Sequence, residues 1–290
     1  MQMKDTYQII TDRLLAILEA GTVPWHKPWN HGYGGPRNLV SNKHYQGINC
    51  FMLACYGASF GSPFWLTYKQ AQSLGGNVKK GEKGTPVIFW KLYDKDDPDA
   101  DTGVRKVPVL RYYTVFNAEQ CTDVDVPPPG GFTRAEHNPI EAAEAVIHAM
   151  PNCPTIEISG ARAYYSPSHD IVKVPELYRY EQAEEYYSTL FHELAHSTGH
   201  QSRLNRESIT GKHFFGDAVY SREELIAEMT AAFLCGHTGI ENATIHNSAA
   251  YIQSWINVLK GNKKLAIIAA AQAQKAADYI LNHHGNQGSE

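Results

Sequence analysis

The chain has 290 residues, of which 43% are hydrophobic and 19% charged, and this composition excludes wholesale disorder. No segment approaches the ~18 consecutive apolar residues of a membrane-spanning helix, and the N-terminus lacks the apolar core of a signal peptide. The five cysteines include no Cys-x-x-Cys pair, so we expect reduced, packed thiols. Because the length exceeds that of most single domains, we expect a cytoplasmic protein of two domains with no membrane partner.

Charge is distributed unevenly between the two halves. Residues 1–120 contain 14 Lys and Arg against 10 Asp and Glu, whereas residues 121–290 contain 12 against 20. Half of the N-terminal acids fall in one short run between Asp94 and Asp101. Outside that run the first half is basic. This charge indicates that the first half binds a polyanion and that the acidic second half has a different function.

The first predicted element is an amphipathic helix over residues 5–20, which stops at Gly21. The segment that follows, residues 23–30, contains two Pro and two Trp and cannot form a regular helix. Trp25 and Trp29 suit either a plug in a core or hinge or a surface that stacks on bases, and the sequence leaves both open.

Residues 41–49 interleave polar, basic and aromatic side chains, which fits a loop that approaches a phosphodiester backbone. An apolar helix is expected over residues 50–56. A short helix is expected to start within residues 65–71, with Thr67 as its N-cap, and to end at Gly75-Gly76.

A turn at residues 77–85 carries three lysines and leads into a strand over 86–91, which pairs as a hairpin with a strand over 109–116. Lysines at a hairpin end are often only solvated. Here they share a segment with many aromatic residues, which favours a single-stranded nucleic-acid surface where lysines neutralise phosphates and rings stack on bases. The predicted DNA contacts are Trp25, Lys27, Trp29, Lys43, Tyr45, Asn49, Lys79, Lys80 and Lys83.

A Pro/Gly-rich run beginning at Pro127 predicts a linker over residues 127–134. It separates a domain of residues 1–126 from a domain of residues 135–290. We expect the fragment 1–126 alone to bind single-stranded DNA better than duplex DNA, with an affinity that falls as salt rises.

The second domain is predicted to begin with a helix over residues 134–150. Short strands follow at residues 155–158, 161–166 and 171–174. A small sheet ahead of a metal-binding helix is the usual order in zinc peptidases, whose outer strand can add a substrate peptide as a further strand.

A His-Glu-x-x-His sequence lies near the end of a predicted amphipathic helix over residues 178–199. Residues four apart lie one above the other on a helix, so His192 and His196 present two imidazoles to one point, as zinc ligands do. Glu193 is placed to act as the general base toward a water. Tyr164 and Tyr165, on a strand near the site, either orient the substrate or oxyanion or simply pack in the sheet.

A third ligand is expected on a helix over residues 221–235, where Glu224 and Glu228 share one face. One carboxylate would bind the metal and the other would orient a histidine. We favour Glu224 as ligand and Glu228 as the orienting residue, although Ser221 and Glu224 also match a capping box and Glu228 also fits a solvated surface. Two further helices over 249–281 should pack behind the site, and weaker ligand candidates are His200, His213 and His237.

The whole chain resembles the ArdC-type antirestriction proteins of conjugative plasmids, whose N-terminal part is also similar to that of the TraC plasmid primases. The matching runs are residues 23–29, 45–49, 65–71, 81–85, 113–117, 192–200 and 223–228. This resemblance implies an α+β fold with a single-stranded-DNA-binding N-terminal domain and a C-terminal zincin-like metallopeptidase domain. It also implies protection of incoming plasmid DNA from restriction. The Glu-x-x-Ala pattern from Glu224 looks like the third-ligand helix of zinc peptidases of the ImmA/IrrE type.

Our leading hypothesis is an antirestriction protein that holds single-stranded DNA and carries a zinc peptidase site on His192, His196 and Glu224, with a host restriction enzyme or another protein as substrate. One alternative is a DNA-coating module with a structural or vestigial metal. Another is a DNA-directed peptidase that removes DNA-bound proteins. A retained Glu193 favours catalysis, because a structural site needs no general base.

Overall fold

The computed structural model describes residues 5–23, 35–96, 104–127, 139–210, 218–240 and 249–283. Of the predicted DNA contacts, Trp25, Lys27 and Trp29 lie outside these segments, as does the ligand candidate His213. Within the described segments, every helix is too short or too polar to span a bilayer.

The N-terminal helix α1 spans Thr6–Glu19, close to the predicted bounds. The Asp5 carboxylate caps it by accepting a hydrogen bond of 3.1 Å from the Tyr7 backbone N–H. The buried stripe of α1 includes Ile10, Leu14 and Leu18, which recur at helical spacing.

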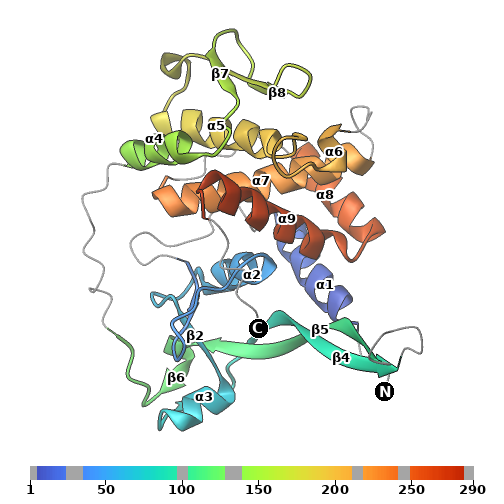
Figure 1. Cartoon of the computed structure of the whole chain (residues 1–290). Coiled ribbons are helices and arrows are strands. Elements are labelled where there is room, and N and C mark those ends of the chain that lie inside the picture. The colour runs from blue at the N-terminus through green and yellow to red at the C-terminus, as the bar shows by residue number, and fades with distance from the viewer. Residues whose placement is uncertain are drawn as a thin grey trace.

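A four-stranded sheet follows in the order β1-β2-β5-β4 (Figure 1). Strands β4 and β5 form the predicted antiparallel hairpin, and each is longer than expected. A second small sheet pairs β3 with β6. The bounds are β1 Arg37–Asn38, β2 Phe64–Thr67, β3 Asn77–Val78, β4 Thr85–Asp96, β5 Val104–Asn117 and β6 Cys121–Thr122.

Helix α2 (Ile48–Gly57) packs on this hairpin, and helix α3 (Tyr68–Ser73) follows β2. The prediction that the α3 helix begins at Trp65 is wrong. Trp65 lies in β2 opposite Asn117, and its side chain is buried. Thr67 nevertheless caps α3 as predicted, in a capping box with Gln70.

The C-terminal part begins with helix α4 (Pro139–Ala149) and a three-stranded sheet in the order β7-β9-β8. Its strands are β7 (Thr155–Ile158), β8 (Tyr164–Ser166) and β9 (Ile171–Val174). The helices that follow are α5 Ala183–Ser197, α6 Glu207–Thr210, α7 Ala218–Thr238, α8 Ala249–Gly261 and α9 Leu265–Ile280.

In the C-terminal part, the predicted starts of α5 and α7 differ from the structure. Helix α5 begins at Ala183, because the residues before it form a 3-10 turn over Leu177–Arg179 and then an extended cap at Gln182. Helix α7 already includes Ala218, so Ser221 lies inside the helix and cannot be its N-cap. The capping-box interpretation of Glu224 is therefore wrong.

One hydrophobic core connects the two halves of the chain. It contains Leu14 of α1, Phe51 of α2, Phe191 of α5 and Phe233 of α7, and the Phe51 and Phe233 ring centroids are 4.5 Å apart. Helix α1 packs against α8, and α2 packs against α9 (Figure 1). The division into segments 1–126 and 135–290 stays a prediction, but the two segments bury their apolar faces against each other.

Candidate metal centre

Helix α5 places the two histidines as predicted. His192 and His196 lie one turn apart, with ring centroids 4.7 Å apart and ring planes at 82°. Their Nε2 atoms are 3.1 Å apart. His192 is buried and the His196 side chain is only 12% exposed, so the imidazoles converge inside the fold rather than at an exposed helix end.

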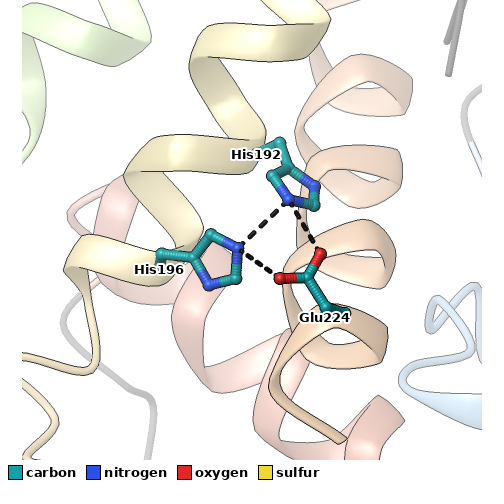
Figure 2. Close-up of side chains that lie close together, drawn as sticks. All are labelled: His192, His196 and Glu224. Atoms are coloured by element: carbon teal, nitrogen blue, oxygen red, sulfur yellow. Dashed lines mark hydrogen bonds and ion pairs between the residues drawn. The ribbon is translucent and has the colours of Figure 1, made fainter. Parts of the chain in front are cut away.

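Glu224 of α7 completes the group of three (Figure 2). Its Oε2 lies 3.5 Å from His192 Nε2, and its Oε1 lies 3.6 Å from His196 Nε2. Metal bonds of ~2.05 Å at tetrahedral angles place neighbouring donor atoms ~3.3 Å apart. The separations of 3.1 to 3.6 Å therefore fit three ligands of one tetrahedral ion, with the fourth position open.

The other ring nitrogen of each histidine faces a carboxylate. His192 Nδ1 lies 3.6 Å from Glu228 Oε1, and His196 Nδ1 lies 3.4 Å from Glu223 Oε1. A carboxylate at Nδ1 fixes the proton on that nitrogen and leaves Nε2 as the donor to a metal. The orientation of both rings thus matches metal binding through Nε2.

Sequence reasoning missed Glu223 and its partner Arg206. The Arg206 guanidinium donates to Glu223 from Nη2 at 2.5 Å and from Nε at 3.1 Å, and the Ser208 hydroxyl also donates to Glu223. Arg206 further donates to the Ala195 carbonyl at 2.8 Å, which connects α5 to α7. One signal could have pointed to Glu223. Metal-binding histidines often donate their other ring N–H to a carboxylate, and Glu223 is the remaining acid of α7 beside Glu224 and Glu228.

The charges around the site suit a cation. Burial opposes protonation of His192, but the carboxylates of Glu224, Glu228 and Glu193 outweigh it and raise its pKa to about 10. Burial also opposes the charged form of Glu228, which raises the pKa of that carboxyl. Several buried carboxylates thus compete for few positive partners, and a divalent cation would relieve that imbalance.

Glu193 is buried on α5 beside the two histidines, with 8% of its surface exposed. Its negative charge helps to raise the pKa of both His192 and His196, which places it close to the ion site. A carboxylate held there is positioned as a proton acceptor.

The remaining candidates near the site have other contacts. The Tyr165 hydroxyl donates to Asp170 at 2.8 Å, and Asp170 also pairs with Arg203, so Tyr165 holds the turn between β8 and β9. Tyr164 is exposed on the edge strand β8. His200 and His237 lie outside the group of three, since His200 contacts Ser202 and His237 lies near His283.

The described DNA-contact candidates fall into two groups. Lys43, Lys79, Lys80 and Lys83 are exposed, although Lys79 Nζ also donates to the Glu119 carbonyl at 2.8 Å. The other group is packed: Tyr45 contacts the core, and the Asn49 amide exchanges two hydrogen bonds of 2.8 Å with the Ile88 backbone. Asn49 therefore holds α2 on strand β4.

Comparisons with known proteins agree with this architecture. Residues 4–116 match the N-terminal domain of the anti-restriction factor ArdC, and residues 141–273 match a zincin-like metallopeptidase family. The chain is 35% identical over 291 residues to the uncharacterized protein y4eC of Sinorhizobium fredii, with 95% of this chain and 91% of that protein covered.

Two proteins of Escherichia coli named DNA primase TraC are 36% and 35% identical to this chain. The similarity covers 99% of this chain but only 20% and 28% of the two primases, so the chain spans about a quarter of their length. The likeness therefore includes the metal centre as well as the N-terminal part.

Crystal structures of the antirestriction protein ArdC from the R388 plasmid have the same fold. The metal-free form has a TM-score of 0.75 at 39% identity and covers 95% of this chain and 96% of that one. The Mn(II)-bound form has a TM-score of 0.77 at 38% identity and covers 98% and 99%.

Proposed function

This chain belongs to the ArdC family of antirestriction proteins, and from that premise we propose that it binds single-stranded DNA and carries a zinc peptidase site. The two activities together protect DNA of a conjugative plasmid from host restriction in the cytoplasm. The observation that carries the peptidase part is the donor arrangement of His192, His196 and Glu224, whose spacing fits one tetrahedral ion. The Mn(II)-bound relative supports a divalent metal, and the two imidazoles with one carboxylate favour zinc.

The chemistry is divided among residues of α5 and α7. When bound, the metal polarises a water and the carbonyl of a peptide bond. Glu193 accepts the proton of the attacking water and returns it to the leaving amine. Glu223 and Glu228 hold the imidazoles in the orientation that leaves both Nε2 atoms toward the ion.

A peptide substrate would bind along the edge of the small C-terminal sheet. Strand β8 is an edge strand that pairs only with β9 among the described strands, and it packs beside α5. An extended peptide can add to such an edge through backbone hydrogen bonds, which makes binding tolerant of sequence. The substrate class is therefore a protein with an extended segment, such as a restriction enzyme of the host.

The test separates catalysis from coating. In Glu193→Gln we expect one metal ion per chain to remain, with loss of peptide hydrolysis and of antirestriction in cells. Glu184→Gln, on the first turn of the same helix, is the matched control and should behave like the unchanged protein. If Glu193→Gln still protects DNA fully, the metal centre serves no hydrolysis in protection and the DNA-coating alternative replaces this proposal.

A further inference from the structure

The register of the β4–β5 hairpin sorts its side chains onto two faces. Thr85 pairs with Val115 and Asp96 pairs with Val104, and every pair between them follows without a bulge. Side chains alternate between faces along a strand, and directly paired residues share a face. All odd-numbered residues of β4 and β5 therefore lie on one face, which we call the odd face.

The odd face is basic and aromatic. Beyond two buried valines at its base, it carries three rings and four cations, and none of its residues in β4 and β5 is acidic. Asp94 of β4 lies on the opposite face. The odd-face rings and cations are Phe89, Lys91, Tyr93, Lys95, Arg105, Arg111 and Tyr113.

Rings and cations on this face contact one another. The Phe89 and Tyr113 rings lie 5.6 Å apart, and each is more than a third exposed. Arg111 and Lys91 lie over the Tyr93 ring, at 5.5 and 5.1 Å from its centroid. Exposed rings held beside cations form a surface that offers both stacking faces and positive charge.

The core ends where this surface begins. Val87 and Val115 lie on the same face at the base of the hairpin, and both are fully buried in a cluster with Leu53 and Trp65. Phe89 and Tyr113 are the next residues outward, and they remain exposed. The fold therefore buries side chains on this face at the base of the hairpin but leaves the two rings next to them exposed. Such an exposed apolar patch is typical of a binding surface.

We propose that the odd face of the β4–β5 hairpin is the surface on which this protein stacks the unpaired bases of single-stranded DNA. Lys91, Lys95 and Arg111 neutralise the phosphates that pass beside the rings. This inference rests on the proposed DNA binding and names its location. The residues that it names differ from the contacts expected from sequence. Among the described ones of those, Tyr45 adjoins this surface, next to Tyr113.

The chemistry selects single strands. Stacking on an exposed ring needs a base with a free face, which a duplex does not offer, whereas the cations attract any polyanion. Same-face residues lie ~6.7 Å apart along a strand, so successive rings suit an extended chain whose bases are separated. Binding should therefore depend on rings and cations for single strands, and only on cations for duplexes.

The full-length protein, a labelled oligothymidylate and fluorescence anisotropy test the location. Phe89→Ala with Tyr113→Ala should weaken binding about tenfold or more, given the usual contribution of one stacked base. Lys91→Gln should lower the slope of log affinity against log salt by about 0.7, the value for one phosphate of a single strand. Matched controls are Tyr112→Ala, a similarly exposed tyrosine on the opposite face, and Lys106→Gln, a lysine on that face.

Each outcome decides the proposal, with circular dichroism and metal content as folding controls. Loss in the odd-face variants with unchanged controls supports it. Equal losses for Tyr112→Ala and for the Phe89→Ala, Tyr113→Ala double variant, or wild-type affinity in the double variant, overturn the location while the proposed DNA binding stands. Polyglutamate serves as a second probe: if the odd-face variants lose binding of polyglutamate but keep that of oligothymidylate, the face binds acidic peptides and the proposal is overturned. No binding of the oligothymidylate by the unchanged protein would overturn both proposals.

Discussion

Glu224 and Glu228 lie one turn apart on α7 but face different nitrogen atoms of His192. Both oxygens of Glu224 face Nε2 atoms, whereas Glu228 faces only the Nδ1 atom of His192. A carboxylate beside the Nε2 atoms can bind the same metal ion as the imidazoles. A carboxylate beside Nδ1 can only accept a hydrogen bond from the ring and so orient the imidazole. The structure thus places the two carboxylates at different ring nitrogens, a difference that sequence spacing could not reveal.

We predict that Glu224→Gln releases its metal far more readily than Glu228→Gln. The first change removes a ligand, while the second should weaken metal affinity by about 10- to 100-fold through loss of an orienting hydrogen bond. Competition with a chelator measures both affinities, and circular dichroism confirms that both variants are folded. Earlier metal loss from Glu228→Gln would exchange the two assignments.

Metal binding should release a proton from His192. Its pKa is raised to about 10 because the surrounding carboxylates outweigh burial, so at neutral pH a divalent cation must displace a proton. Affinity should therefore increase about tenfold per pH unit below that pKa. Titration calorimetry with Zn²⁺ in buffers of different ionisation enthalpy counts the protons released. An affinity that does not change between about pH 6 and 8 would contradict this coupling.

At the scale of elements, helices α5 and α7 are joined by the buried pair of Glu223 and Arg206. Burial opposes ionisation of Glu223, but its hydrogen bonds to His196 and Arg206 outweigh that effect and lower its pKa from 4.5 to about 2. A carboxyl with a lowered pKa stabilises the fold above its unfolded pKa, and that stabilisation is lost as pH falls from about 4.5 toward 2. The shift corresponds to about 3 kcal/mol.

We predict that Glu223→Gln lowers the free energy of unfolding at pH 7 by about 3 to 5 kcal/mol, because Arg206 would remain buried without its ion partner. The variant should also lose much of the steep decline in stability between about pH 4.5 and 2. Urea unfolding at several pH values in the presence of a chelator measures both effects. Glu157→Gln, which breaks a surface ion pair with Lys173, is the control and should cost less than ~1 kcal/mol.

The sequence predicted features that depend on neighbouring residues. The Thr67 cap and the histidine pair on α5 are local, since each follows from residues three or four apart. The start of α7 was missed, because the Ser-x-x-Glu pattern at Ser221 also occurs inside helices. Arg206 donates to Glu223, which lies 17 residues later in the chain. A contact between a loop residue and a helix residue leaves no periodic pattern in the sequence, so it could not be predicted.

At the scale of the molecule, the β4–β5 hairpin and strand β8 lie at opposite ends, with helices α5 and α7 nearer to β8 (Figure 1), and one core is shared by the two halves of the chain. Between them, α1 and α2 pack against α8 and α9, with the Thr11 hydroxyl donating to the Lys263 carbonyl at 2.8 Å. DNA on the odd face would therefore leave the edge of β8 accessible to a protein substrate. The same core makes the fold of the N-terminal half depend on the C-terminal helices.

The isolated fragment 1–126 should therefore not fold, contrary to the expectation from sequence that it binds DNA alone. Leu14, Phe51 and their neighbours would lose their partners on α7, α8 and α9, and burial of one such side chain contributes about 1.5 to 3 kcal/mol. We expect the fragment to aggregate or lack a cooperative unfolding transition. Co-expression with residues 127–290 should restore a folded complex that binds single-stranded DNA. Salt-dependent binding of oligothymidylate by a monomeric, cooperatively folded 1–126 fragment would show instead that the shared core is dispensable for DNA recognition.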